Sequence, residues 1–595
     1  FWAAFMESLR HSQHDSAPIR CSGRDDDNVE SDAASRDPIY LDYNATTPID
    51  PAVAEEMIPV LRAEFGNPSS AHALGRRANA VVEGARARVA QLLNCSADEV
   101  VFTSGGTESN NWAIKGAVSA YTTTCSAPAA AAPAAVLAPH VVISAVEHPA
   151  VTEVVEHVRA VAGCEVTVVP VDAHGMVCVH QVMAAVRPTT AIISIMLANN
   201  EVGSLQPIAR IAAALTSHKA AVAAQALQDA VKAGSDKATT TAAAAAAAAT
   251  AAVFPYLQTD ASQAVGKIPV DFPALGVDLL TLAAHKLYGP KGVGALVVRR
   301  GVHLPKLMHG AGHEKGRRAG TESTVLLAGL GKACELARAC LPGDATHSER
   351  MRSRLLHGLA RRLCLVTPQA VTGEGEGNTV PGMQSSDDAA AVAAEGDGEG
   401  DKDMVRFRVN GPCDPRQRLP NTLSAVCHHD SKHCTVAAPA HCLVLLAVAC
   451  LGTLVSFDFL PSVRSESAMT HTLASFGDFA LPISSSPIRP SLPPRTPYLH
   501  ASLRTASPSK ACTAPPSWRD SSPESHAVPV LPAIPLPLPP APPLPPLPRP
   551  YAGCTVRVSV GRWTTEQEVD AAAQIIADAV MQLNNEQQQQ QQQQV

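Results

Sequence analysis

The stretch VDLLTLAAHK, residues 277–286, decides the fold expected of this chain, because it is an apolar run of strand length that ends at a lysine. Similar apolar runs recur along the chain, with segments of helix length between most of them. They are VVISAVEH (141–148), EVTVVPV (165–171), AIISIMLANN (191–200), PYLQTDAS (255–262) and GALVVRR (294–300). Continuous rather than alternating apolar runs are typical of strands that helices cover on both faces. The sequence therefore predicts an α/β fold with a mostly parallel central sheet.

Composition excludes several classes of partner. The formal net charge is -7, with no basic excess to neutralise the phosphates of a nucleic acid. The apolar run at 442–457 has 16 residues, fewer than the roughly 20 that cross a bilayer, so no membrane partner is expected. The 15 cysteines follow no disulfide or zinc-ribbon spacing, which favours a reducing compartment. We expect a cytoplasmic protein, and targeting to an organelle stays open because the sequence begins at Phe1.

Changes in composition predict the domain organisation. The low-complexity segments are too polar, or too rich in alanine or proline, to build a packed core. The expected parts are a disordered N-terminal segment (1–37), a large domain (38–330) with Ala-rich insertions (121–139 and 219–252), a small C-terminal α+β domain (331–427 and 551–584), a Pro-rich insertion (428–550) and a Gln-rich tail (585–595).

Two charged residues follow predicted strands and are candidates for chemistry. Asp260 and Lys286 both stand where a strand ends, so in a parallel sheet they would meet at its carboxyl edge. A desolvated lysine there could form a Schiff base, and an aspartate could hold a pyridinium nitrogen protonated. Alternatively, Asp260 caps a turn and Lys286 is a solvated lysine at a strand end. Spacing alone does not decide between these readings.

A glycine-rich turn offers a place for a phosphate group. The segment SGGTESNN (104–111) lies between a strand-like run and a helical one, so its backbone N–H groups and the helix N-terminus could bind an anion. Gly105 and Gly106 would permit close approach, and Thr107 would add a hydroxyl. An ordinary βα loop is the alternative, because the pattern is neither G-x-G-x-x-G nor a Walker motif.

The motifs together resemble those of class V aminotransferases, specifically cysteine desulfurases and selenocysteine lyases. They cover about half of the chain in the family's order. The segments are IYLDYNATTPIDP (39–51), FGNPSSAHALG (65–75), SGGTESNN (104–111), VEHPAV (146–151), MLANNEVG (196–203), TDASQAVGK (259–267), HKLYGPKGVGAL (285–296), GAGHEKGRRAGTE (310–322) and VRVSVGRWTTEQEVD (556–570). The resemblance implies a fold-type I enzyme with pyridoxal 5'-phosphate as cofactor and an amino acid as substrate.

The resemblance also implies a role for individual residues. Lys286 would attach the cofactor, Asp260 would pair with its pyridine nitrogen, and His148 would stack on the ring and share in proton transfer. The phosphate would be held by Gly106, Thr107, His285 and, from the neighbouring subunit of a homodimer, Thr321. Asn200 and Gln263 would bind near the phenolic oxygen, and Arg557 would clamp the substrate carboxylate, for which a planar guanidinium is well suited.

Two places depart from the family pattern. Ala283-Ala284 stands where desulfurases usually have Ser-Gly, which removes one phosphate hydroxyl and is closer to selenocysteine lyases. The acceptor cysteine is best matched by Cys512 in TASPSKACTAPPS (505–517), although an incidental cysteine in Pro/Ser-rich sequence fits equally well. A further segment, CHHDSKHC (427–434), is rich in histidine and cysteine. Its spacing matches no standard zinc site, so no metal is expected.

The expected function is removal of selenium or sulfur from L-selenocysteine or L-cysteine, which yields L-alanine and selenide or an enzyme persulfide. A protein that accepts the sulfur or selenium would be a further partner. Two alternatives stay open: a related aminotransferase or lyase without an acceptor cysteine, and a scaffold whose small domain has been disrupted by the long insertion between residues 426 and 551.

Overall fold

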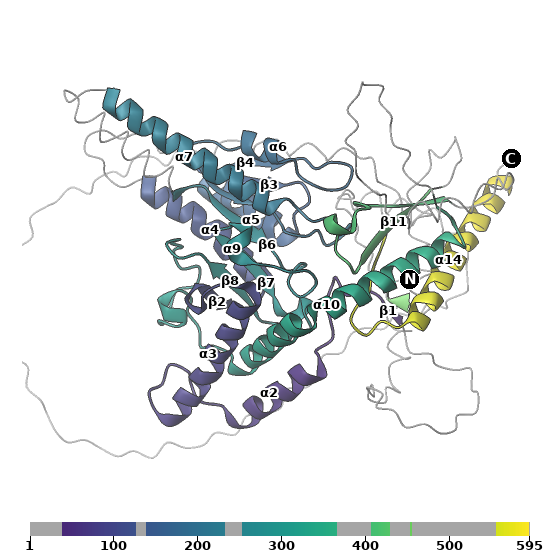
Figure 1. Ribbon diagram of the computed structural model, residues 1–595, viewed down its shortest axis with the longest axis horizontal. Coiled ribbons are helices and arrows are strands. Elements are labelled where there is room, and N and C mark those ends of the chain that lie inside the picture. Colours follow the sequence, from purple (N-terminus) through teal and green to yellow (C-terminus); the bar gives the residue numbers. More distant parts are fainter. Residues whose placement is uncertain are drawn as a thin grey trace, which may run out of the picture. The chain divides into compact units, whose positions relative to one another are not determined.

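A computed structural model describes residues 39–125, 138–232, 253–365, 406–428, 453–454 and 555–593. Internal contacts divide the chain into two units, and every described residue belongs to the unit formed by residues 1–458 and 551–595. Figure 1 shows this unit with many of its elements labelled.

The core of the described part is a seven-stranded sheet with the order β2-β8-β7-β6-β5-β3-β4. Its strands are β2 (Val100–Thr103), β3 (His140–Ser144), β4 (Glu165–Val169), β5 (Thr190–Ser194), β6 (Tyr256–Asp260), β7 (Leu279–Ala283) and β8 (Gly294–Val298). Strands β4, β3, β5, β6 and β7 pair in parallel, while β8 is antiparallel to both β7 and β2. The mostly parallel α/β sheet predicted from the apolar runs is confirmed.

Alternate residues of these strands enter two different cores, because successive side chains of a strand point to opposite faces. On β3, Val142 belongs to one core, which also contains residues of α3, α7 and α10. Its neighbours Val141 and Ile143 belong to the other core, formed with α4 and α5. The sheet is therefore covered on both faces, which explains why its strands read as continuous apolar runs.

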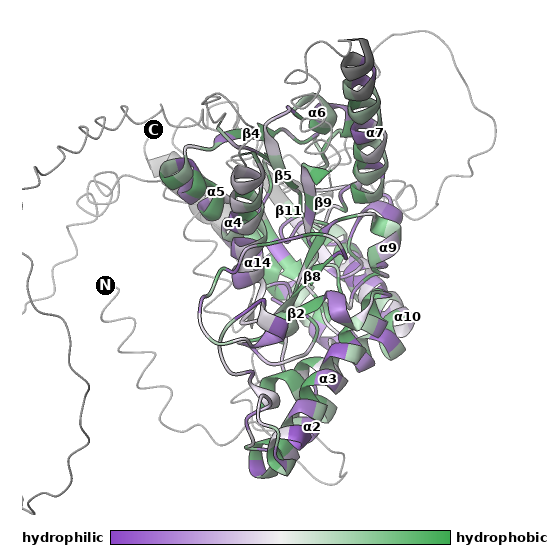
Figure 2. Cartoon of the chain, turned by 90° about the vertical axis from the view of Figure 1, so that its left-hand side faces the viewer, coloured by the Kyte–Doolittle hydropathy of each residue, from purple (hydrophilic) through white to green (hydrophobic). Residues whose placement is uncertain are grey.

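The helices that cover the sheet are amphipathic, and Figure 2 shows hydrophobic and hydrophilic residues interleaved along α2 and α10. The helical elements of this part are α2 (Pro51–Ala63), α3 (Ala73–Leu93), η1 (Ala97–Glu99), α4 (Gly106–Cys125), α5 (Pro149–Ala162), α6 (Val179–Ala184), α7 (Ile208–Lys232), α9 (Phe272–Leu275), η2 (Ala284–Lys286), η3 (Glu314–Gly316) and α10 (Thr324–Ala360). Asp50 caps α2 by accepting a hydrogen bond from Ala52 N at 2.9 Å.

A smaller four-stranded sheet, in the order β13-β11-β10-β9, packs on α10 and α14. Its strands are β9 (Cys364–Leu365), β10 (Arg406–Val409), β11 (Thr422–His428) and β13 (Thr555–Ser559), with η4 (Pro415–Gln417) before β11 and α14 (Glu566–Gln593) after β13. Helix α14 begins with a capping box, because Thr565 Oγ1 accepts from Glu568 N at 3.2 Å and Thr565 N donates to Glu568 Oε2 at 2.7 Å. A separate two-stranded sheet pairs β1 (Ile39–Tyr40) with β12 (Thr453–Leu454) in parallel.

Several expected boundaries differ from the structure. Helix α4 continues to Cys125 and buries Tyr121 against Phe254, so the insertion expected from residue 121 begins too early. Helix α7 likewise continues to Lys232, because alanine favours helix, and α14 extends through the glutamines to Gln593. The boundary expected at residue 330 falls inside α10, which contributes residues first to one core of the large sheet and then to the core of the small sheet.

Within the part of the chain that the structure describes, no helix combines the length and hydrophobicity needed to span a bilayer.

Candidate active site

The carboxyl ends of β6 and β7 bring Asp260 and Lys286 to the same edge of the sheet. Asp260 is the last residue of β6 and pairs in register with Thr281 of β7, and Lys286 ends the short helix η2 that follows β7. Asp260 is 9% exposed, and its carboxylate accepts hydrogen bonds from Asn110 Nδ2 at 2.7 Å and Ser262 N at 2.9 Å. These two donors fix the orientation of the carboxylate at the strand end.

The glycine-rich turn forms a cradle at the start of α4. Gly105 has φ +150°, which favours glycine, and α4 begins at Gly106. A Cβ atom on Gly106 would lie 3.1 Å from Ser262 Oγ, so a larger residue would crowd this point. Ser262 Oγ is buried without a hydrogen-bond partner in the described residues. Thr107 is exposed on the first turn of the helix. A helix N-terminus with these neighbours suits an anionic group.

The two predicted histidines lie in different environments. His285 Nδ1 lies 3.2 Å from Thr46 Oγ1, and the His285 carbonyl accepts from Thr47 N at 2.9 Å. Burial, followed by the charge of Lys286, lowers the pKa of His285 to about 4, so its imidazole is neutral near pH 7. His148 is exposed and caps α5, where its Nδ1 accepts from Ala150 N at 3.0 Å.

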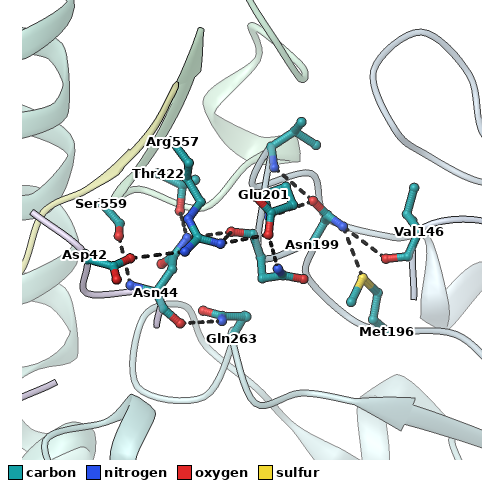
Figure 3. Close-up of polar contacts among 12 residues, drawn as sticks. Asp42, Asn44, Val146, Met196, Asn199, Glu201, Gln263, Thr422, Arg557 and Ser559 are labelled. Carbon is teal, nitrogen blue, oxygen red and sulfur yellow. Dashed lines mark hydrogen bonds and ion pairs between the residues drawn. The ribbon is translucent and has the colours of Figure 1, made fainter. Parts of the chain in front are cut away.

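Asn44 connects the residues of the site across the two sheets. Its carbonyl accepts hydrogen bonds from Gln263 Nε2, at 2.9 Å, and from Lys286 Nζ. Its side-chain amide donates to the Asn200 carbonyl at 3.0 Å and to Thr422 Oγ1 at 2.9 Å. The side chain is 1% exposed, and Figure 3 shows it among residues of both domains. Asn44 therefore holds Gln263, Asn200 and Lys286 together.

Arg557 reaches this group from β13 of the small domain. Its guanidinium pairs with Asp42 Oδ1 at 3.1 Å and with Glu201 Oε1 at 2.7 Å, and Nη1 also donates to the Asn200 carbonyl at 3.4 Å (Figure 3). The Arg557 side chain is only 5% exposed. A buried guanidinium with two carboxylates can exchange one of them for the carboxylate of a bound molecule.

Glu147 is a buried acid that lies between the end of β3 and the segment after β5. Ser144 Oγ and Met196 N donate hydrogen bonds to its Oε1, the latter at 3.0 Å, while Oε2 has no partner among the described residues. Burial is the main cause that raises the pKa of Glu147 to about 8. The carboxyl group is therefore mostly protonated at neutral pH.

The segment that contains Thr321 is anchored by two ion pairs. Arg86 of α3 forms a bidentate pair with Glu314, with both N···O distances 2.8 Å, and Arg318 pairs with Glu108 of α4 at 2.9 Å. Thr321 itself is exposed. The segment thus lies beside the start of α4, and Thr321 faces solvent in the single chain.

The structure brings four of the predicted site residues together through one asparagine. Lys286, Gln263, Asn200 and Arg557 meet around Asn44. The remaining predicted residues within the described ranges lie at strand ends, the cradle or the Thr321 segment: Asp260, His285, His148, Gly106, Thr107 and Thr321. Cys512 and most of CHHDSKHC lie outside the described residues.

Sequence reasoning missed three residues of this region. Asn44 and Glu147 stand inside quoted motifs, YNATT and VEHPAV, but neither was given a role. Lys267 follows Gln263 by four positions, which places both on one face of a helical turn. That spacing was the available signal, and the structure shows Lys267 Nζ bonded to Gln263 Oε1 at 2.7 Å.

Comparison with known proteins gives consistent matches over this part of the chain. The family model described as aminotransferase class-V matches residues 39–249 and 243–370, which is more than half of the chain. A cysteine desulfurase IscS from Dictyoglomus turgidum is 38% identical over 325 residues, which are 55% of this chain and 70% of that protein. A cysteine desulfurase IscS from Neisseria meningitidis is 40% identical over 325 residues, 54% of this chain and 68% of that protein.

Solved structures support the fold. A NifS-like protein superposes with a TM-score of 0.56 at 24% identity, covering 91% of this chain and 99% of that one. A NifS-like protein from Rickettsia africae superposes with a TM-score of 0.53 at 20% identity, again covering 91% and 99%. Both likenesses bear on the fold alone.

Proposed function

The chain belongs to the class-V aminotransferase family, and we propose that it is a pyridoxal-phosphate-dependent enzyme that removes sulfur or selenium from L-cysteine or L-selenocysteine. The observation that carries this proposal is the joint placement of Lys286, Asp260 and Arg557. A strand-end lysine and aspartate share one edge of the sheet, and a buried arginine reaches the same region from the small domain.

The residues present suit pyridoxal phosphate. A phosphate would lie at the cradle of Gly106 and Thr107, where the absence of a side chain at Gly106 leaves the helix N-terminus open. Lys286 would attach the aldehyde, and Asp260, oriented by its hydrogen bond from Asn110, would face the pyridine nitrogen. When bound, the cofactor withdraws electrons from the α-carbon of the amino acid.

Neutral His285 fits this arrangement, because it can donate one hydrogen bond without adding a further charge beside Lys286. Asn200 and Gln263 would lie near the ring's phenolic oxygen, and both are fixed by Asn44. Thr321, exposed in one chain, would contribute to the phosphate site of a second chain in a homodimer.

The substrate would be oriented through its carboxylate. Arg557 would bind that group after giving up one of its present carboxylate partners, Glu201 or Asp42. Lys286, at the end of η2, and His148, at the exposed cap of α5, would move the α-proton.

The sulfur leaves by transfer to a thiol, for which we propose Cys512. Its thiolate forms a bond to the β-sulfur of cysteine while the bond from that sulfur to the β-carbon breaks, and a proton completes alanine. The products are one alanine and one persulfide, so atoms and electrons balance without an added oxidant or reductant. A partner protein would then accept the sulfur. Ala283-Ala284, ahead of His285, is the feature that favours selenocysteine as an additional substrate.

The experiment has two stages. Purified protein should show the visible absorbance of bound pyridoxal phosphate, and Lys286→Ala should lose it, whereas Lys291→Ala, which alters an exposed lysine of the same loop, should keep it. Protein that stays colourless with excess cofactor would refute the proposal and leave only the scaffold alternative.

The second stage measures alanine release from cysteine and from selenocysteine. Wild type should release alanine from at least one of them, and Cys512→Ser should abolish release from cysteine. Bound cofactor without alanine release from either amino acid would favour another aminotransferase or lyase activity. Equal rates for Cys512→Ser and wild type would remove Cys512 from the mechanism.

A further inference from the structure

Arg557, the residue proposed to bind the substrate carboxylate, is already paired with two carboxylates of the chain. Asp42 Oδ1 lies 3.1 Å from Nη2 and Glu201 Oε1 lies 2.7 Å from Nη1, and Figure 3 shows the guanidinium between them. The Arg557 side chain is only 5% exposed, and one guanidinium cannot balance the charge of three carboxylates. A substrate must therefore replace one of these partners, and their surroundings indicate which one.

Asp42 belongs to the backbone arrangement that also carries Arg557. Its backbone forms a parallel bridge with Ser559, two residues after Arg557 on β13, and its carbonyl accepts a hydrogen bond from Ala45 N at 3.0 Å. The Asp42 side chain is short and 18% exposed. The ion pair between Asp42 and Arg557 thus joins neighbouring backbone segments, which places Asp42 to stay on the guanidinium and to orient it.

Glu201 reaches Arg557 from the loop that follows β5 of the large sheet. The backbone there is held in place, because Glu201 N and Val202 N both donate to Asn199 Oδ1 at 2.9 Å. The Glu201 side chain has one more rotatable bond than that of Asp42, and it is 34% exposed. It can therefore leave the guanidinium by turning into water, without a change in the backbone, and it regains rotamer freedom when it does.

The carboxylate of Glu201 also contacts the proposed cofactor site. Its Oε1, which pairs with Arg557, accepts a hydrogen bond from Asn200 Nδ2 as well. Asn200 is the residue proposed to lie near the phenolic oxygen of the cofactor. One carboxylate oxygen thus holds a donor meant for the substrate and a donor meant for the cofactor, and its departure would release both.

From these contacts we propose that Glu201 is an internal competitor for the substrate carboxylate. Its side chain occupies Arg557 in the empty site, and the incoming carboxylate displaces it while Asp42 stays in place. The inference rests on the proposed function, because it uses Arg557 as the residue that binds the substrate. Glu201 then sets how tightly an amino acid binds, and a ligand without a carboxylate does not meet this competition.

Binding of L-alanine to the cofactor-loaded protein tests the proposal, with ethylamine as the matched ligand that lacks only the carboxylate. Both are titrated through the visible absorbance of the cofactor. Glu201→Gln keeps an acceptor oxygen for Asn200 and removes the charge, so the Kd for L-alanine should fall about fivefold, because a partly exposed ion pair no longer has to be broken. The KM for cysteine should fall by a similar factor. The Kd for ethylamine should not fall.

Asp42→Asn is the matched control variant, because it removes the other carboxylate of the same guanidinium. Glu201 remains on Arg557 in this variant, so L-alanine should bind no more tightly than it binds to wild type. Equal tightening by Asp42→Asn and Glu201→Gln would indicate a general effect of charge near Arg557 and would overturn the proposal. Tighter binding of ethylamine to Glu201→Gln, by the same factor as L-alanine, would also overturn it.

A crystal structure of the cofactor-loaded wild-type protein with L-alanine tests the same exchange without any variant. The ligand carboxylate should lie on Arg557, with Asp42 still paired and Glu201 beyond hydrogen-bond distance. A structure in which Glu201 keeps its place on Arg557 would overturn the proposal, whether or not Asp42 has moved.

The outcomes separate this inference from the proposed function. Wild-type protein that never binds pyridoxal phosphate would refute the proposed function, and this inference with it. Wild-type protein that binds both the cofactor and L-alanine, with a Kd equal to that of Glu201→Gln, would refute only the role of Glu201.

Discussion

Replacing Arg86 with methionine should destabilise the protein by about 3–5 kcal/mol, the cost typical of removing one partner from a buried ion pair. The side chains of Arg86 and Glu314 are 2% and 1% exposed, so neither can turn to water when the other is lost. Methionine fills a similar volume, so the effect comes from charge and hydrogen bonding rather than from a cavity.

The size of the effect follows from the contacts that are lost. Arg86 donates to both oxygens of Glu314 at 2.8 Å and to the Val100 carbonyl at 2.9 Å, and its guanidinium lies 4.5 Å from the centre of the Phe102 ring. After the substitution, the carboxylate of Glu314 keeps only Phe102 N, at 2.9 Å, among its described hydrogen-bond donors. An uncompensated charge would remain in the core.

Thermal unfolding of the apo-protein measures the change, and a loss of this size corresponds to a midpoint lower by roughly 10 °C. The double variant Arg86→Met/Glu314→Gln should recover much of the loss, because no buried charge remains. Arg300→Met is the matched control: Arg300 and Asp98 form an equally close pair at 2.7 Å, but their side chains are 67% and 48% exposed. A midpoint shift for Arg86→Met no larger than that for Arg300→Met would refute the reasoning.

Three further predictions concern the site. Because the pKa of Glu147 is raised from 4.5 to about 8 on folding, the folded state binds the proton more tightly and stability should fall as pH rises between these values. Glu147→Gln should remove that slope, which thermal midpoints at about pH 5 and pH 8 would show, and a slope equal to that of wild type would contradict the assignment. Asn44→Ala removes four side-chain hydrogen bonds and should cost about 3 kcal/mol in urea unfolding, whereas Asn67→Ala, at an exposed turn, should have little effect. Arg557→Lys should raise the KM for cysteine at least about tenfold while the cofactor absorbance is retained, since an ammonium cannot bind a carboxylate through two parallel hydrogen bonds. An unchanged KM would exclude Arg557 from substrate binding.

The strands of the large sheet could be predicted because each one is buried on both faces and therefore apolar throughout. Asp260 and Lys286 could be predicted to lie close together, because the carboxyl ends of parallel strands meet at one edge of the sheet. The antiparallel direction of β8 could not be seen, because an apolar run has no direction. The predicted ends of α4 and α7 were too early. Alanine-rich sequence can continue a helix as well as form a surface insertion, and composition does not distinguish the two.

Contacts between distant parts of the chain were beyond the sequence argument. Asn44 could not be recognised as a centre of hydrogen bonds, because its partners come from residues as far apart as Asn200 and Thr422. The pairing of Arg557 with Glu201 likewise depends on how the small sheet packs on the large one. Local pattern carries no information about such distances, whereas a buried polar side chain must find its partners wherever the fold places them.

The late position of β13 affects how the enzyme is made on the ribosome. All seven strands of the large sheet have been synthesised by Val298, but Ser559, which accepts a hydrogen bond from Asn44 N at 2.8 Å, follows only after the long intervening sequence. At elongation rates of about 5–20 residues per second, the nascent chain waits roughly 10 to 50 seconds for its final strand. A polypeptide released before Thr555 would contain Lys286 and Asp260 without Arg557. If the proposed roles hold, premature termination should yield a protein that binds vitamin B6 and does not bind the carboxylate of an amino acid.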